Sequence, residues 1–200
     1  MKGSLIIVGF FAVGILCGFY QWIPAGAVPA NVSYLALCAL MFCVGISIGS
    51  DSKVLSSFRK LNPRLMLLPL MTIVGTLAGN LVAAELLPHR SLGDCLAVGS
   101  GFGYYSLSSI FITQYKGAEL GTVALLSNIM REIIALLCAP LLVRYFGRLS
   151  LISVGGATTM DTTLPIITRY SGQDLVIVSI YHGFIVDFSV PFLVTFFCSI

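Results

Sequence analysis

Charged side chains are scarce in this sequence. Asp, Glu, Lys and Arg make up 10% of the 200 residues, hydrophobic residues make up 58%, and the mean hydropathy is +1.00. Soluble domains carry about 25% charged residues, so the composition excludes an ordinary soluble domain. Because one transmembrane helix takes about 20 apolar residues, residues 1–200 are expected to form a single all-α membrane domain. The net charge of +3 is attributed to membrane topology, and no nucleic-acid partner is expected.

Groupings of metal-binding and catalytic residues are also missing. The two histidines, His89 and His182, are far apart, and the six cysteines lie mostly in apolar runs and form no C-x-x-C pair. This pattern gives no reason to expect a metal, a cofactor or a disulfide framework. The glycine-rich stretch from Gly99 lacks the spacing and the Lys of a phosphate-binding loop. An intramembrane aspartyl protease built on Asp161 and Asp187 would need a Gly-x-Gly-Asp motif, which is absent, so no enzymatic activity is expected.

Five apolar stretches are candidate full membrane spans. They are Leu5–Tyr20, Tyr34–Ile48, Leu65–Leu87, Gly121–Leu142 and Asp174–Ile200. The first also resembles a signal peptide, since Lys2 precedes it and the small residues of Ala25–Ala30 follow it. A first transmembrane helix is the favoured interpretation, because every later segment is membrane-like as well.

Two further apolar segments, Cys95–Tyr115 and Leu149–Ile167, are interrupted. The first contains Gly99, Gly101 and Gly103, and each glycine weakens a helix by about 1 kcal/mol relative to alanine. Irregular backbone at membrane depth is tolerated only where it is buried in protein or lines an aqueous cavity. Each interrupted segment follows one clean helix, a pattern typical of a transporter's binding site. The units Leu65–Tyr115 and Gly121–Ile167 are therefore candidates for a structural repeat.

The distribution of positive charges tests whether the interrupted segments cross the membrane or re-enter it. If both re-enter and the N-terminus is inside, eight Lys and Arg residues lie inside and two outside, with Arg131 in the membrane. If both cross, the split falls to seven against three. The positive-inside rule favours re-entry, which would make the second unit inverted relative to the first.

Ionisable residues within the apolar segments are expensive and mark candidate sites. Arg131 and Glu132 lie near the middle of Gly121–Leu142, where Glu132 shares a helix face with Asn128. One interpretation is structural, with both residues bonded to carbonyls of the interrupted segments. The other is that Glu132 binds a cation or carries a proton.

Asp161 is the sharpest candidate, because it lies inside an interrupted segment between threonine pairs that include Thr158 and Thr162. A carboxylate beside unwound backbone suits an organic ammonium, a proton or a sodium ion. The alternative is an N-cap for a half-helix beginning near Thr162. Asp187, with His182 five residues earlier, is either a second proton site or a partner of Arg131.

Small and polar residues of the first interrupted segment complete the candidate set. Gly101, Tyr104 and Ser106 either line a polar cavity or simply pack together. With Asn128, Thr158 and Thr162 they are expected to surround a substrate or a coupling ion.

Four motifs together resemble the LysO-type lysine exporter family over essentially the whole chain. They are Gly99–Ser108, Asn128–Glu132, Gly155–Pro165, and Tyr181–Phe184 followed by Pro191. The resemblance implies export of L-lysine and its toxic analogues across the bacterial cytoplasmic membrane, with Asp161 as the motif acid. Longer members carry further N-terminal helices, so this chain matches their C-terminal two-thirds. The expected partner is therefore a small membrane protein that supplies those helices, or a second copy of the chain.

The charges of lysine give this function a physical basis. Half-helix N-termini are expected to receive the carboxylate, and Asp161, with Glu132, an ammonium group. Moving one positive charge outward against the membrane potential costs about 2.3 kcal/mol per 100 mV, so antiport with a proton or sodium ion is expected. Two alternatives stay open: a transporter of another amino acid or an organic anion clamped by Arg131, and a non-transporting subunit of a two-chain exporter.

Overall fold

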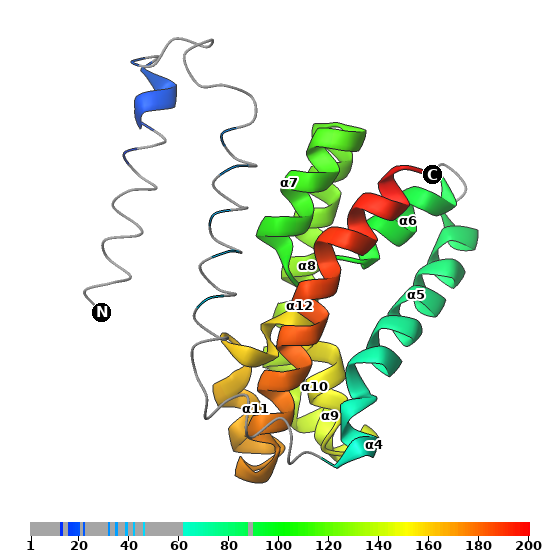
Figure 1. Cartoon of the computed structure of the whole chain (residues 1–200), viewed down its shortest axis with the longest axis vertical. Helices are drawn as coiled ribbons and strands as arrows, with labels where there is room; N and C mark the ends of the chain where they lie inside the picture. The colour runs from blue at the N-terminus through cyan, green and yellow to red at the C-terminus, as the bar shows by residue number, and fades with distance from the viewer. Residues whose placement is uncertain are drawn as a thin grey trace. The chain divides into compact units, whose positions relative to one another are not determined.

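The structure is a computed structural model that describes residues 13, 16–20, 22, 32, 35, 39, 42, 46, 62–87 and 90–200. The chain divides into two compact units, Met1–Met41 and Phe42–Ile200. Every regular element among the described residues is helical, which agrees with the predicted class. The predicted spans Leu5–Tyr20 and Tyr34–Ile48 fall largely outside the described residues. The second unit carries all of the elements discussed below (Figure 1).

Three helical stretches of the described chain are long and apolar enough to cross a membrane: Pro63–Leu86, Ala118–Leu137 and Gln173–Cys198. The first comprises α4 (Pro63–Met66) and α5 (Leu68–Leu86), the second is α8 (Ala118–Leu137), and the third comprises η2 (Gln173–Leu175) and α12 (Val176–Cys198). They correspond to three of the five predicted spans.

The predicted span Gly121–Leu142 was wrong at its C-terminal end. Helix α8 ends at Leu137, and a separate helix, α9 (Ala139–Phe146), follows with Pro140 in its first turn. Proline lacks the amide proton that a helix interior requires and its ring clashes with the preceding turn, so it is favoured at a helix start. The chain therefore restarts its helix at Ala139.

The first interrupted segment folds as a helical hairpin. Helix α6 (Leu92–Gly99) leads into a turn at residues 100–104, and α7 (Tyr105–Lys116) returns. The Lys116 Nζ atom lies 3.4 Å from the Asp94 carboxylate, which joins the end of α7 to the first turn of α6. Ser91 caps α6 by accepting a hydrogen bond from the Asp94 amide at 3.1 Å. The predicted interruption is confirmed, and the start of α6 lies close to the end of α7.

The second interrupted segment has the same construction. It consists of α10 (Ser150–Gly155), η1 (Gly156–Met160) and α11 (Leu164–Tyr170). The Ser171 hydroxyl, just after α11, donates to the Arg148 carbonyl, just before α10, at 2.8 Å. Arg148 in turn donates to the Ser171 carbonyl and pairs with Asp174. The start and the end of this segment are therefore tied together as well.

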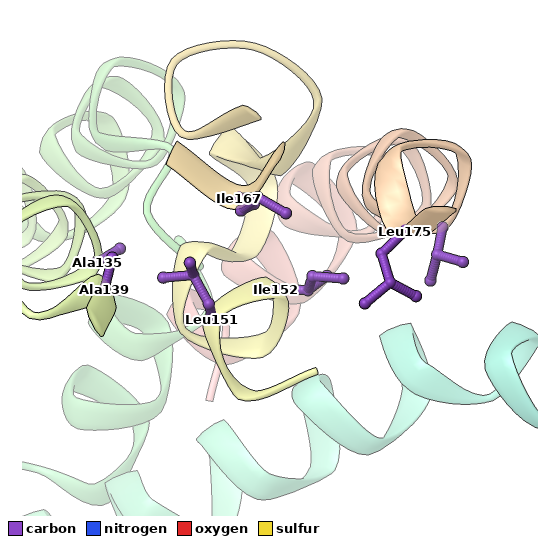
Figure 2. Close-up of a cluster of buried hydrophobic side chains, with 7 residues drawn as sticks. Ala135, Ala139, Leu151, Ile152, Ile167 and Leu175 are labelled. Carbon is purple, nitrogen blue, oxygen red and sulfur yellow. The ribbon is translucent and has the colours of Figure 1, made fainter. Parts of the chain in front are cut away.

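A buried apolar cluster fixes the second hairpin against the long helices (Figure 2). Leu151 of α10 lies toward Ala135 and Ala139, whereas Ile152 lies toward Leu175 at the start of the α12 span. Helix α12 then passes along both hairpins and ends beside the start of α6. Its Phe197 carbonyl lies 3.2 Å from where a Cβ on Gly93 would be.

The tips of the two hairpins touch through their backbones. The Ala157 amide of η1 donates to the Phe102 carbonyl of the first turn at 2.9 Å. A Cβ on Gly156 would overlap that same carbonyl oxygen, and Gly156 has a φ of +63°, which side chains rarely adopt. Only glycine fits at position 156, so the two tips depend on this glycine to meet.

We expect Gly156→Ala to destabilise the protein by more than about 2 kcal/mol, because it adds backbone strain and a clash with Phe102. The measurement is the thermal unfolding midpoint of the detergent-solubilised protein. Gly147→Ala is the matched control, since Gly147 also has a positive φ, +86°, but its Cβ would meet no atom within 4 Å. Equal midpoints for the two variants would contradict the close crossing.

Candidate functional site

Asn128, at the middle of α8, holds the tip of the first hairpin. Its side-chain oxygen accepts a hydrogen bond from the Gly103 amide at 2.7 Å, and its amide nitrogen donates to the Val98 carbonyl at 3.3 Å. The side chain is 3% exposed. It also contacts Ser108 at 3.4 Å, and a Cβ on Gly101 would come within 2.5 Å of it. Asn128 and Gly101 therefore form the packed support of the turn.

Arg131 holds the second hairpin from the next turn of α8. Its Nε donates to the Val154 carbonyl at 2.9 Å and its Nη2 to the Ser153 carbonyl at 3.0 Å, at the C-terminal end of α10. Its guanidinium also lies over the Phe102 ring, 5.9 Å from the ring centre. The structural interpretation of Arg131, bonding to carbonyls of an interrupted segment, is confirmed. Because Asn128 and Arg131 are three residues apart, one helix face reaches both tips.

Asp161 follows η1 and is exposed at the turn before α11. Its carboxylate accepts a hydrogen bond from the Thr162 amide at 2.5 Å. The N-cap interpretation was wrong: α11 begins at Leu164, its N-cap residue is Thr163, and no side chain caps it. Since Pro165 already occupies the first turn of α11 and needs no amide partner, the helix starts without a capping carboxylate.

Asp187 of α12 brings a second carboxylate to this place. It is 5% exposed, and its carboxylate interacts electrostatically with that of Asp161. The hydroxyl of Tyr104, at the end of the first hairpin's turn, lies within electrostatic range of both carboxylates. The prediction that Asp187 pairs with Arg131 was wrong, because the described hydrogen bonds of Arg131 go to two carbonyls and to Thr76. These partners lie on α10 and α5, and none of them lies on α12.

His182 joins three elements through threonine hydroxyls. Its Nδ1 lies 3.2 Å from the Thr159 Oγ1 of η1, and its Nε2 lies 2.9 Å from the Thr72 Oγ1 of α5. The ring is fully buried in α12. One turn of η1 also packs on the same helix, where a Cβ on Gly183 would come within 2.8 Å of the Met160 amide. The second tip is therefore fixed to α12 by polar bonds and close packing.

The other predicted site residues either bond within a hairpin tip or lie at least partly exposed. The Thr158 hydroxyl is buried and bonds to the Gly155 carbonyl at 2.9 Å and to Thr163 at 3.2 Å. Thr162 and Ser106 are exposed, and Glu132 is half-buried on α8. Thr158 thus stabilises the tip internally, while Thr162 lies beside Asp161 in the sequence and in the turn.

Residues of α5 were missed by the sequence interpretation. Thr76 accepts a hydrogen bond from Arg131 Nη1 at 3.3 Å, Thr72 bonds to His182, and Asn80 packs so closely on Gly99 that a Cβ there would overlap it. The three residues recur at intervals of four in an otherwise apolar helix, so they form one polar stripe. This spacing of polar side chains was the sequence signal that could have identified the three residues.

The chain matches known proteins over nearly its whole length. Residues 8–198 match the family described as "Lysine exporter LysO". The chain is 38% identical over 197 residues to the lysine exporter LysO of Escherichia coli K12, covering 98% of this chain and 62% of that protein. It is 31% identical over 196 residues to a Haemophilus influenzae protein described as "Putative lysine exporter", covering 98% of this chain and 96% of the relative.

No solved structure matches the chain significantly. The family match, the near-complete coverage of the Haemophilus relative and the three apolar helices agree with one another. The chain is therefore a membrane protein that belongs to the LysO lysine exporter family.

Proposed function

We propose that this chain exports L-lysine and its analogues across the bacterial cytoplasmic membrane, in exchange for an inward proton or sodium ion. The observation that carries the proposal is the arrangement of Asp161, Asp187 and Tyr104 where the hairpins meet α12. Two carboxylates that interact electrostatically in a membrane protein favour the binding of a cation. An ammonium group and a coupling cation would occupy this place in turn.

The family supports lysine as the substrate. The Escherichia coli relative is named a lysine exporter, and this chain spans about 62% of its length. We assign the alternating role to Asp161, which is exposed and therefore reachable by both lysine and the coupling ion. Asp187 and His182 are the second proton position, and Glu132 is an auxiliary acid for the ammonium group. A further small membrane protein or a second copy of the chain completes the assembly.

Re-entry of both hairpins into the membrane is the second part of the proposal. Each hairpin has its two ends tied together, by Lys116 with Asp94 in the first and by Arg148 with Ser171 in the second. Helix α8 runs between them, so the two hairpins enter from opposite sides and meet at Phe102 and Ala157. The units α5–α7 and α8–α11 then form an inverted repeat, as in many secondary transporters.

We expect Asp161→Asn to abolish lysine export while leaving membrane insertion intact, because an amide cannot hold a cation electrostatically. The measurement is efflux of labelled lysine from preloaded cells that express the chain alone. Glu119→Gln is the matched control, since this exposed acid pairs with Arg90 away from the tips. Export by Asp161→Asn at the wild-type rate would refute the role of Asp161. If cells that express the unsubstituted chain alone export no lysine, addition of the small partner decides whether further helices are required.

The topology has its own test, which uses Tyr115→Cys and Tyr145→Cys in a chain without its six native cysteines. Both tyrosines are exposed and lie near the ends of α7 and α9. If the first hairpin re-enters, a membrane-impermeant thiol reagent labels position 115 on intact cells, and position 145 only after permeabilisation. The reverse result would show that the first interrupted segment crosses the membrane.

A further inference from the structure

An open cavity of about 450 Å³ lies between α5, α8 and α10, and neither Asp161 nor Asp187 lines it. We call it the Arg131 cavity. Its walls carry a guanidinium, hydroxyl groups and apolar side chains, contributed by Met71, Thr72, Gly75, Thr76, Arg131, Ser153 and Val154. A volume of 300–1,000 Å³ is typical of small-molecule sites.

The positive charge of Arg131 has no carboxylate partner in the described part of the chain. The ion pairs there are Arg90–Glu119, Lys116–Asp94 and Arg148–Asp174. Arg131 donates to two carbonyls and to the Thr76 hydroxyl, all of them neutral. A guanidinium has five N–H donors, so two remain beyond these three bonds. An uncompensated cation inside a membrane is costly, and a bound anion would offset that cost.

We propose that the Arg131 cavity binds the α-carboxylate of the exported amino acid. The proposal rests on the proposed function and assigns the carboxylate to a side-chain pocket rather than to the N-termini of the half-helices. Guanidinium groups recognise carboxylates by planar, two-point hydrogen bonding, and the Thr76 hydroxyl, which accepts from Arg131, keeps its own hydrogen to donate. The apolar remainder of the wall suits the methylene chain of lysine.

The cavity is connected to the second hairpin tip by hydrogen bonds. Thr72 lines the cavity and bonds to His182 at 2.9 Å, and His182 reaches Thr159 of η1 at 3.2 Å. The guanidinium itself bonds to the Ser153 and Val154 carbonyls that precede η1. A carboxylate bound here therefore acts on the same tip that carries Asp161.

The test fills the cavity and leaves Arg131 in place, because Arg131 also supports the second hairpin. Gly75 lines the cavity, and a Cβ on it meets no atom within 4 Å, so Gly75→Leu places a side chain in the open space. Gly79→Leu is the matched control: Gly79 is one turn further along α5, is equally open, and does not line the cavity. Both variants raise the helix propensity of α5 by the same amount, so a difference between them in lysine binding reports on the cavity.

Binding of labelled lysine to the purified protein is the readout, with lysinamide, which lacks the carboxylate, as competitor. We expect Gly75→Leu to weaken lysine binding about tenfold or more and Gly79→Leu to leave it unchanged. On the wild type, lysinamide should compete at least about tenfold more weakly than unlabelled lysine.

Wild-type lysine affinity in Gly75→Leu, or equal competition by lysine and lysinamide, would overturn the carboxylate site while lysine export stands. A wild-type protein that neither binds nor exports lysine, whether alone or with the small partner, would overturn both proposals. The two failures are therefore distinguishable in one experiment.

Discussion

Two side chains of α8, Asn128 and Arg131, hold the tips of the two hairpins in place, and the rest of the structure depends on this contact. Each satisfies backbone groups that an interrupted helix leaves open: Asn128 at Val98 and Gly103, Arg131 at Ser153 and Val154. At the membrane depth proposed for the tips water is scarce, so these groups need protein partners. The spacing of three residues on α8 makes a single helix face serve both hairpins.

That constraint explains the composition of the tips. The backbones meet between Phe102 and Ala157, where only glycine fits at position 156. Glycine also weakens the helices, so the same residues that permit the crossing create the interruption. Each interruption in turn leaves a short segment outside the α-helices, which carries Tyr104 in the first hairpin and Asp161 in the second. Fold and proposed site are therefore consequences of the same close approach.

Local chemistry was enough to predict some of this from sequence. Glycine clusters marked both interruptions, and the structural role of Arg131 was one of the two interpretations that the cost of a charge in an apolar helix left open. The helix end at Leu137 was missed because the apolar run continues past Pro140. The pairing of Asp187 with Arg131 and the cap by Asp161 were wrong, since both depend on which elements meet. The Thr72 and Thr76 contacts also require that tertiary information, although their four-residue spacing signalled a polar face.

The central claim is that α8 supports both tips as one unit, and hydrogen exchange tests it directly. In Asn128→Ala, amide exchange should accelerate in the turn at residues 100–104 and also in η1, because the Ala157 amide bonds to the Phe102 carbonyl. Thr122→Ala, which removes a hydroxyl bonded only within α8, is the control. Faster exchange at both tips agrees with the account, whereas a change confined to residues 100–104 would contradict it.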